Sequence, residues 1–176
     1  MKRKNKTNLA EYIRDIPDFP KKGIIFKDIT TLLNDPWAFK KAVDQMVRKF
    51  KSSKIDQVVG IESRGFIFGA VIAYKLGAGF VPVRKKGKLP GKTKSVTYDL
   101  EYGTDTLEIH KDAMTPKSRV LIVDDLLATG GTVKGVAKLV KSLKARVVGV
   151  VFLVELTFLK GRDKIKGLPV EVLVKY

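Results

Sequence analysis

The residues with the clearest chemical potential directly follow an apolar run, residues 120–123. Two adjacent carboxylates come first, and a turn of small residues and hydroxyls leads from them into a helical pattern. The acids are Asp124 and Asp125, and the turn comprises Ala128, Thr129, Gly130, Gly131 and Thr132. Such a turn directs backbone N–H groups and the positive end of a helix dipole at a phosphate. Carboxylates beside it suit sugar hydroxyls, so the segment predicts a sugar-phosphate site.

Other interpretations of this segment fit less well. A Walker A loop has a lysine after its glycines, and none stands there. A dinucleotide-binding fingerprint has its acid about 20 residues after the glycines, whereas here both acids precede them. A plain strand end and turn would not gather two acids, two hydroxyls and two glycines within the nine residues 124–132.

The composition argues against several other kinds of site. There is no cysteine, which excludes a disulfide framework, a thiolate metal site and a thiol nucleophile. The single histidine, His110, disfavours a multi-histidine metal site and a Ser-His-Asp triad. No apolar run approaches the roughly 20 residues of a membrane helix, and no secretory signal follows the basic opening residues. We therefore expect a cytoplasmic protein without a membrane partner.

The net charge of +17, from 35 Lys and Arg against 18 Asp and Glu, is of the kind found in nucleic-acid-binding proteins. The excess is spread along the chain, however. Residues 1–54 hold 14 basic and 6 acidic groups, 55–119 hold 11 and 7, and 120–176 hold 10 and 5. Because no separate basic tail stands out, we expect no nucleic-acid partner.

The hydrophobic patterns predict the elements that must position these residues. Helical spacing predicts helices over 8–15, 36–51, 66–76 and 131–143, the first ended by Pro17 and Pro20. β-Branched runs predict strands over 57–61, 79–83, 119–123, 146–154 and 170–174. Between them, 84–118 is predicted to be a long loop carrying a β-hairpin, with strands over 96–100 and 107–110. The alternation of strand and helix predicts one α/β domain with a mostly parallel sheet.

Several motifs resemble those of known enzymes. The strand, acid pair and Thr-Gly-Gly-Thr turn of 120–132 resemble the phosphoribosyltransferase signature for 5-phosphoribosyl-1-pyrophosphate. Further segments look like the adenine phosphoribosyltransferases, namely 19–29, 62–66, 84–91, 98–103, 154–156 and 159–162. The resemblance implies the type I phosphoribosyltransferase-like α/β fold, with a central mostly parallel sheet flanked by helices. It also implies a single domain over 1–176, with a small N-terminal base-binding hood over 1–34 and a flexible β-hairpin flap over 84–104.

The resemblance further implies which residues hold phosphoribosyl pyrophosphate. Asp124 and Asp125 would hold the ribose hydroxyls, and the amides and hydroxyls of 128–132 would hold the 5′-phosphate. The pyrophosphate would be bound by Glu62, Ser63, Arg64, Arg84 and Lys88. A non-proline cis peptide between the first two of these is typical of the family.

By the same resemblance, adenine would lie near the Phe26 ring, read by main-chain groups of Ile25, with Arg64 close by. Glu101, beside Tyr102 at the flap tip, would exchange a proton with N7 of adenine, because loss of water under a closed flap raises the pKa of a carboxyl. Without the resemblance, Phe26 is better explained as a core residue and Glu101 as a hairpin-turn acid. His110 lies past the hairpin, which disfavours it as a general base.

The implied reaction is purine salvage, in which adenine and 5-phosphoribosyl-1-pyrophosphate give AMP and pyrophosphate. Mg²⁺ would be held mainly by the substrate rather than by the protein. A homodimer is expected, because a basic flap residue in this family can reach a neighbouring subunit's site. Two alternatives stay open: a transferase for hypoxanthine or xanthine, and a phosphoribosyl-pyrophosphate-sensing regulator that binds nucleic acid. The second is disfavoured because the acid pair, the flap and Glu101 occur together.

Overall fold

The structure is a computed structural model that describes residues 8–99 and 103–176. The described residues form two compact units, divided after Gln45 within one helix. The sequence-based expectation of one domain with a hood over 1–34 stays a prediction.

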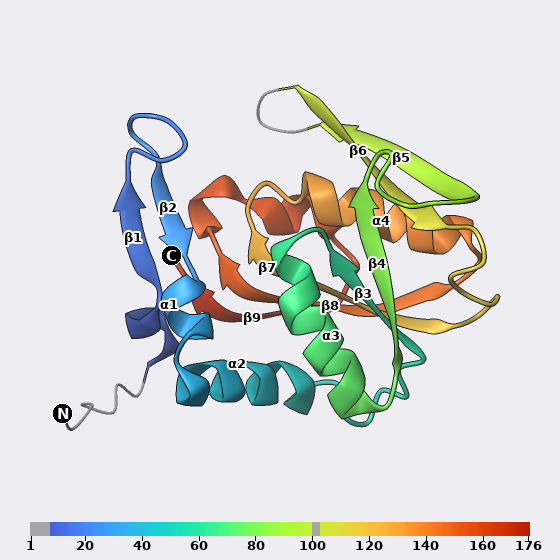
Figure 1. The fold of residues 1–176 in the computed structure, drawn as a ribbon, viewed down its shortest axis with the longest axis horizontal. Helices are drawn as coiled ribbons and strands as arrows, with labels where there is room; N and C mark the ends of the chain where they lie inside the picture. The colour runs from blue at the N-terminus through green and yellow to red at the C-terminus, as the bar shows by residue number, and fades with distance from the viewer. Residues whose placement is uncertain (1–7, 100–102) are drawn as a thin grey trace. The chain divides into compact units, whose positions relative to one another are not determined.

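The first unit contains a short 3₁₀ helix, a β-hairpin and the start of a long helix (Figure 1). Its elements are η1 Leu9–Tyr12, β1 Arg14–Pro17, β2 Ile25–Asp28, α1 Thr30–Leu33 and α2 Pro36–Arg48, the last of which continues past the division. The two strands pair antiparallel. Arg14 ties them together by an ion pair of 2.5 Å to Asp28.

The predicted helix over 8–15 is wrong. Only Leu9–Tyr12 coil, as a 3₁₀ helix, and Ile13 already has extended backbone with φ −100° and ψ 128°. Residues 14–17 then pair with β2, so the hairpin ladder supplies the hydrogen bonds that a helix would have made. Pro17 is compatible with this strand because each strand of a two-stranded sheet has a free edge.

The helix predicted over 36–51 is confirmed at its start and ends earlier, at Arg48. Asp35 fixes the start, because its carboxylate accepts the N–H groups of Trp37 and Ala38, each at 3.0 Å. Pro36 occupies the first helical position, where the missing N–H removes no hydrogen bond.

The second unit is built on a seven-stranded sheet in the order β5-β6-β4-β3-β7-β8-β9 (Figure 1). Its strands are β3 Gln57–Ile61, β4 Gly79–Lys85, β5 Thr93–Asp99, β6 Thr104–His110, β7 Arg119–Leu127, β8 Arg146–Glu155 and β9 Val170–Lys175. The strands from β4 to β9 in this order run parallel. The hairpin of β5 and β6 adds an antiparallel edge. The predicted sheet and hairpin are therefore both confirmed.

Two helices cover opposite faces of this sheet: α3 Arg64–Leu76 and α4 Gly131–Ser142. On β3, Val59 and Ile61 belong to the core cluster that includes the apolar residues of α4. Gly60, between them, faces α3, because a Cβ at this position would lie 3.3 Å from the Gly65 carbonyl oxygen. Since neighbouring residues of a strand point to opposite faces, the two helices enclose the sheet, as Figure 1 shows with α3 in front and α4 behind.

The strand β7 extends beyond its predicted end. The apolar run predicts a strand over 119–123, whereas β7 continues to Leu127. The reason is that the long strand β8 offers pairing partners beyond residue 123. Asp124 pairs with Phe152, and Leu126 pairs with Val154. The acid pair therefore lies inside the strand, held in register by the sheet.

Two short 3₁₀ helices, η2 Thr157–Leu159 and η3 Gly161–Ile165, connect β8 to β9. Within the described residues, no helix is long and apolar enough to cross a membrane.

Candidate active site

The predicted phosphate-binding turn joins β7 to α4. Gly130 is the N-cap of α4, in the left-handed conformation with φ 78°, and no side chain caps the helix. A helix N-terminus leaves its first N–H groups without partners inside the helix. The turn therefore presents amides, together with the positive end of the helix dipole, to an anion.

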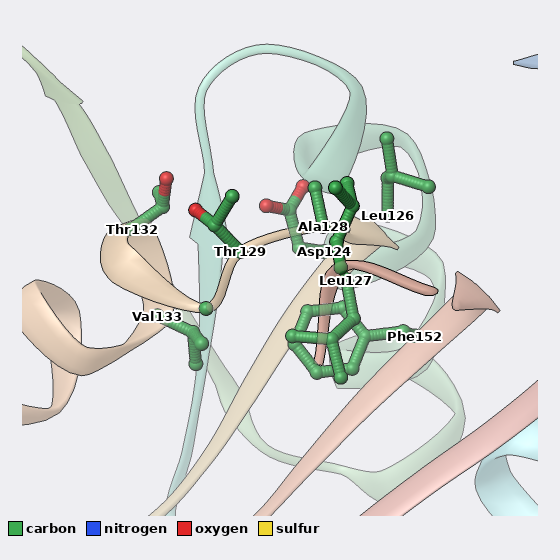
Figure 2. A pocket seen from close by; sticks show the side chains of 10 residues that line it. Asp124, Leu126, Leu127, Ala128, Thr129, Thr132, Val133 and Phe152 are labelled. Carbon is green, nitrogen blue, oxygen red and sulfur yellow. The ribbon is translucent and has the colours of Figure 1, made fainter. Parts of the chain in front are cut away.

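A cavity of about 340 Å³ opens beside this turn. Figure 2 shows the Asp124 carboxylate and the Thr129 and Thr132 hydroxyls along one side, with the Phe152 ring below. The remaining lining residues are Leu126, Leu127, Ala128, Gly130, Val133 and Leu159. The predicted ribose 5-phosphate residues are thus brought together, although Asp125 and Gly131 do not line the cavity. Polar groups above an apolar floor suit a sugar phosphate.

The two carboxylates have different surroundings. Asp125 is only 4% exposed, and its Oδ2 lies 3.0 Å from Nε of Arg64. Asp124 is partly exposed and borders the cavity. Burial of its carboxyl, followed by the charge of Asp125, raises the pKa of Asp124 well above its usual range. Burial also raises the pKa of Asp125, and Arg64 opposes that rise. Arg64 therefore balances the negative charge of Asp125 within the protein. Asp124 borders the cavity and is the acid that faces a ligand.

A second strand-to-helix turn lies on the neighbouring strand, because β3 pairs with β7. The peptide between Glu62 and Ser63 is cis, which confirms the feature that the resemblance implied. Ser63 is the N-cap of α3 but makes no side-chain capping bond. Gly65, in the first turn of α3, packs on β7, because a Cβ there would lie 2.8 Å from the Val123 carbonyl oxygen. Two uncapped helix starts thus lie side by side.

Glu62 organises the basic residues predicted to bind pyrophosphate. Its Oε1 accepts from Nη2 of Arg84 at 3.1 Å, and its Oε2 accepts from the Lys85 N–H at 2.9 Å. Nη1 of Arg84 donates to the Lys88 carbonyl oxygen at 3.0 Å. The Arg84 guanidinium, with help from the Lys85 N–H, lowers the pKa of Glu62. An ionised carboxylate repels pyrophosphate, so the Glu62 side chain suits the orientation of Arg84 better than direct anion binding.

The stem of the flap rests on the helix that begins at the phosphate turn. Val96 and Tyr98 of β5 flank Gly135 of α4, where a Cβ would lie 3.4 Å and 3.5 Å from them. Burial of the phenol raises the pKa of Tyr98, and interaction with the Thr132 side chain opposes that rise. Tyr98 was not among the site residues predicted from the sequence, although its alternation with Val96 marks one face of the strand. Glu101 and Tyr102 lie outside the described residues.

His110 lies at the end of β6, away from the acid pair in the sheet. Its Nε2 is 2.8 Å from the carbonyl oxygen of Pro90. The two residues line a separate cavity of about 400 Å³ together with Gly91, Lys92, Lys111 and Asp112. The ring therefore has a structural partner in the loop that follows β4.

Two of the three predicted base-binding residues, Ile25 and Phe26, belong to the first unit, whereas Arg64 belongs to the second. Ile25 begins β2 opposite Pro17 and is 56% exposed. The Phe26 ring meets Phe19 edge-on, with centroids 5.1 Å apart and 79° between the ring planes. An aromatic pair beside an exposed strand offers both a stacking surface and main-chain groups to a purine.

Within 8–99 and 103–176, no group of three or more His, Cys, Asp or Glu side chains could hold a metal ion. The carboxylates of Asp124 and Asp125 are the hard oxygen ligands that Mg²⁺ prefers, but Asp125 is paired with Arg64. An ion that enters with a phosphorylated substrate would therefore take most of its ligands from that substrate and from water. The donor set fits such an ion.

Comparison with known proteins agrees with this geometry. The family model described as the phosphoribosyl transferase domain matches residues 29–173. A curated adenine phosphoribosyltransferase of Clostridium perfringens (strain SM101 / Type A) is 62% identical over 169 residues, covering 96% of this chain and 98% of that protein. The crystal structure of adenine phosphoribosyltransferase from Thermoanaerobacter pseudethanolicus superposes with a TM-score of 0.93 at 55% identity, covering 96% of this chain and 98% of that one.

A Saccharomyces cerevisiae adenine phosphoribosyltransferase, solved with an imino-altritol bisphosphate and adenine, has a TM-score of 0.88 at 45% identity, covering 94% of this chain and 96% of that one. These likenesses extend over nearly the whole chain and confirm the type I phosphoribosyltransferase fold class. With the acid pair, the glycine turn and the cis peptide in place, the chain belongs to the adenine phosphoribosyltransferase family.

Proposed function

We propose that this chain transfers the phosphoribosyl group of 5-phosphoribosyl-1-pyrophosphate to N9 of adenine, giving AMP and pyrophosphate. The observation that carries the proposal is the cavity in which Asp124, Thr129 and Thr132 border the uncapped start of α4. That arrangement suits a ribose 5-phosphate. Family membership supports the choice of base, because a related enzyme has been solved with adenine.

The ribose 5-phosphate part of the substrate would occupy this cavity. The N–H groups of 129–132 and the hydroxyls of Thr129 and Thr132 would bind the phosphate, and Asp124 would accept hydrogen bonds from the ribose hydroxyls. Asp125 would contribute by holding Arg64 through their 3.0 Å ion pair.

The pyrophosphate would lie at the neighbouring turn. Ser63 and Arg64 offer the uncapped start of α3. Arg84, near the end of β4, and Lys88, in the loop after it, offer positive charge. As the bond from ribose C1 to the pyrophosphate oxygen breaks, positive charge develops on the sugar and negative charge on the leaving group. Cations and amides already fixed in place stabilise that separation without reorganising, and we expect them to make the largest contribution to catalysis.

By the family resemblance, the base would be held by the main chain of Ile25, the ring of Phe26 and Arg64. N9 attacks ribose C1 while N7 exchanges a proton. We assign the proton exchange to Glu101, because a carboxyl covered by an aromatic base loses water and its pKa rises toward neutrality. Tyr102 would help the flap over 84–104 to exclude water, which otherwise hydrolyses the activated sugar.

Three further parts of the proposal rest on the family. Mg²⁺, bound mainly to substrate oxygens near Asp124, would neutralise charge on the pyrophosphate. The working form would be a homodimer, and the compartment would be the cytoplasm. Dependence of the rate on added Mg²⁺, sedimentation of the purified chain and cell fractionation test these three points in turn.

An AMP-formation assay with four competing bases tests the central proposal. Adenine, hypoxanthine, guanine and xanthine are offered together with phosphoribosyl pyrophosphate and Mg²⁺, and the nucleotide products are separated. We expect AMP to dominate. A different nucleotide would reassign the base, and salt-sensitive nucleic-acid binding without any nucleotide product would favour a regulator.

A further inference from the structure

The segment after β8 lies directly on the phosphate turn. A Cβ on Gly130 would clash with the carbonyl oxygen of Gly161, and a Cβ on Gly161 would clash with the carbonyl oxygen of Ala128. The two loops therefore meet backbone to backbone at two points, where only glycine fits. Any shift of Gly161 would be felt at the turn that offers its N–H groups to phosphate.

An ion pair fixes the position of Gly161. The next residue, Arg162, donates from Nε to Oε1 of Glu155 at 2.8 Å. Glu155 ends β8 directly opposite Leu127, the last residue of β7 before the turn. On the other side of the segment, Ile165 of η3 is buried in the core. The segment is thus anchored at both ends next to the phosphate turn.

The burial of Glu155 is unusual for a carboxylate. The residue is only 4% exposed, whereas the Arg162 side chain is 43% exposed. Its second oxygen, Oε2, is buried without a hydrogen-bond partner among the described residues. Buried carboxylates are rare because the loss of water is costly unless a cation compensates for it. Arg162 supplies that cation. Because desolvation of the Glu155 carboxylate is costly, we infer that the pair does more than hold a surface loop.

We propose that Glu155 and Arg162 are positioning residues for the ribose 5-phosphate. Their ion pair holds Gly161 in contact with the phosphate turn, and this contact keeps the N–H groups of the turn directed at the anion. The inference rests on the proposed function of that turn. Neither side chain needs to touch the substrate. The pair acts by fixing the turn before the ligand arrives, which reduces the ordering that binding would otherwise require.

Calorimetric titration with ribose 5-phosphate, together with steady-state kinetics, tests this role. The variants are Glu155→Gln, Arg162→Gln and the double substitution. Lys164→Gln is the matched control, since Lys164 is exposed on the same 3₁₀ helix and loses the same charge. Because Arg162→Gln leaves a buried carboxylate without its cation and can unfold the chain, the double variant, which removes both charges, keeps the test valid. Thermal unfolding confirms the folded fraction of each variant.

We expect the Kd for ribose 5-phosphate and the KM for phosphoribosyl pyrophosphate to rise about tenfold in the double variant, the lower end of the loss seen when the partners that orient metal ligands are removed. The kcat and the KM for adenine should stay within about threefold, and Lys164→Gln should match the wild type. Because the two side chains act as one unit, the Kd of the double variant for ribose 5-phosphate should be no higher than the higher Kd of the two single variants.

Wild-type affinity in the folded double variant would overturn the inference. So would a uniform loss in which kcat and both KM values change together, because that result indicates a purely structural ion pair. Failure of the wild-type chain itself to bind ribose 5-phosphate would overturn the proposed function of the turn, and the inference with it.

Discussion

The two strand-to-helix turns of the site share a backbone plan but differ in how they offer positive charge. Both follow neighbouring parallel strands, β3 and β7, and both helices start without a side-chain cap. The β7 turn is made of glycines and hydroxyls and carries no basic side chain. The β3 turn carries Arg64 and has Arg84 held beside it by Glu62. One turn relies on amides, whereas the other adds side-chain cations that protein partners hold in place.

This difference matches the requirements that the proposed reaction places on the two anion sites. The 5′-phosphate is the same in substrate and product, so its site needs only constant binding, which fixed amides provide. The pyrophosphate gains negative charge as it leaves, so its site must bind it most strongly in the transition state and then release it. Side-chain cations such as Arg84, which have a protein partner of their own, can do both.

The largest effect is expected from a residue that belongs to neither turn. Glu101→Ala should lower kcat by about 10²–10⁴, the usual contribution of general acid–base catalysis. The affinity for ribose 5-phosphate should stay unchanged, because both anion sites are intact. Stopped-assay kinetics and calorimetry measure the two quantities, with Glu171→Ala on β9 as the control. A wild-type kcat would remove Glu101 from the mechanism.

Arg84→Ala should affect the leaving-group site alone. We expect kcat to fall about 10²-fold, the size seen when one fixed donor to a developing anion is removed. The Kd for ribose 5-phosphate should change less than twofold. Lys86→Ala is the control, because Lys86 is exposed two residues further along the chain and carries the same charge. Equal loss in both variants would show that only the overall charge of this segment matters.

Gly130→Ala should affect the other turn. The left-handed φ of 78° and the clash with Gly161 would displace the turn's amides. Losing one charge-assisted hydrogen bond raises the KM for phosphoribosyl pyrophosphate by about 10- to 100-fold. Gly167→Ala separates the two causes, since Gly167 has φ 88° but open space around it. If the control loses affinity equally, backbone strain rather than the phosphate turn is responsible.

The smallest effects should be on stability, and they should differ in sign between the two turns. The folded pKa of Glu62 is lowered, so its ion pair stabilises the fold above the ordinary value of 4.5, and this stability is lost as the pH falls through the lower folded pKa. The folded pKa of Asp124 is raised above 3.8, so its charge destabilises the fold at neutral pH, and the cost disappears in acid.

At pH 7, Glu62→Gln should therefore unfold at lower urea concentration and Asp124→Asn at higher concentration than the wild type. Each change should be on the order of 1 kcal/mol or less. Both differences should shrink when the titration is repeated near pH 3. Changes of the same sign in the two variants would contradict the contrast between the turns.

Contiguous features of the site were predictable from the sequence. The acid pair and the glycine turn lie within nine residues, so one apolar strand followed by a helical pattern was enough to place them. Most strands and helices also followed from local periodicity. The helix over 8–15 was wrong because pairing of 14–17 with β2 overrode the apolar spacing.

Contacts between distant segments were not predictable in the same way. The pairs Arg64 with Asp125 and Tyr98 with Thr132 join residues that only the sheet order brings together. The contact of Gly161 with the phosphate turn has a weak signal, a glycine beside an arginine after the last long strand. Hydrophobic periodicity does not predict which loop a glycine will contact, because that contact depends on strand lengths and register.

The seam between β4 and β6 has a consequence for how the flap and the pyrophosphate site are connected. The flap strands β5 and β6 pair with each other over Thr93–Asp99, but β6 joins the parallel sheet through Arg84 opposite Glu108 and Lys85 opposite Leu107. Arg84 therefore lies at the two-residue connection between the hairpin and the parallel sheet. Under the proposed function, the residue that binds the leaving group is also one of the two β4 residues that hold the hairpin to the sheet, so the pyrophosphate site and the flap share one structural element.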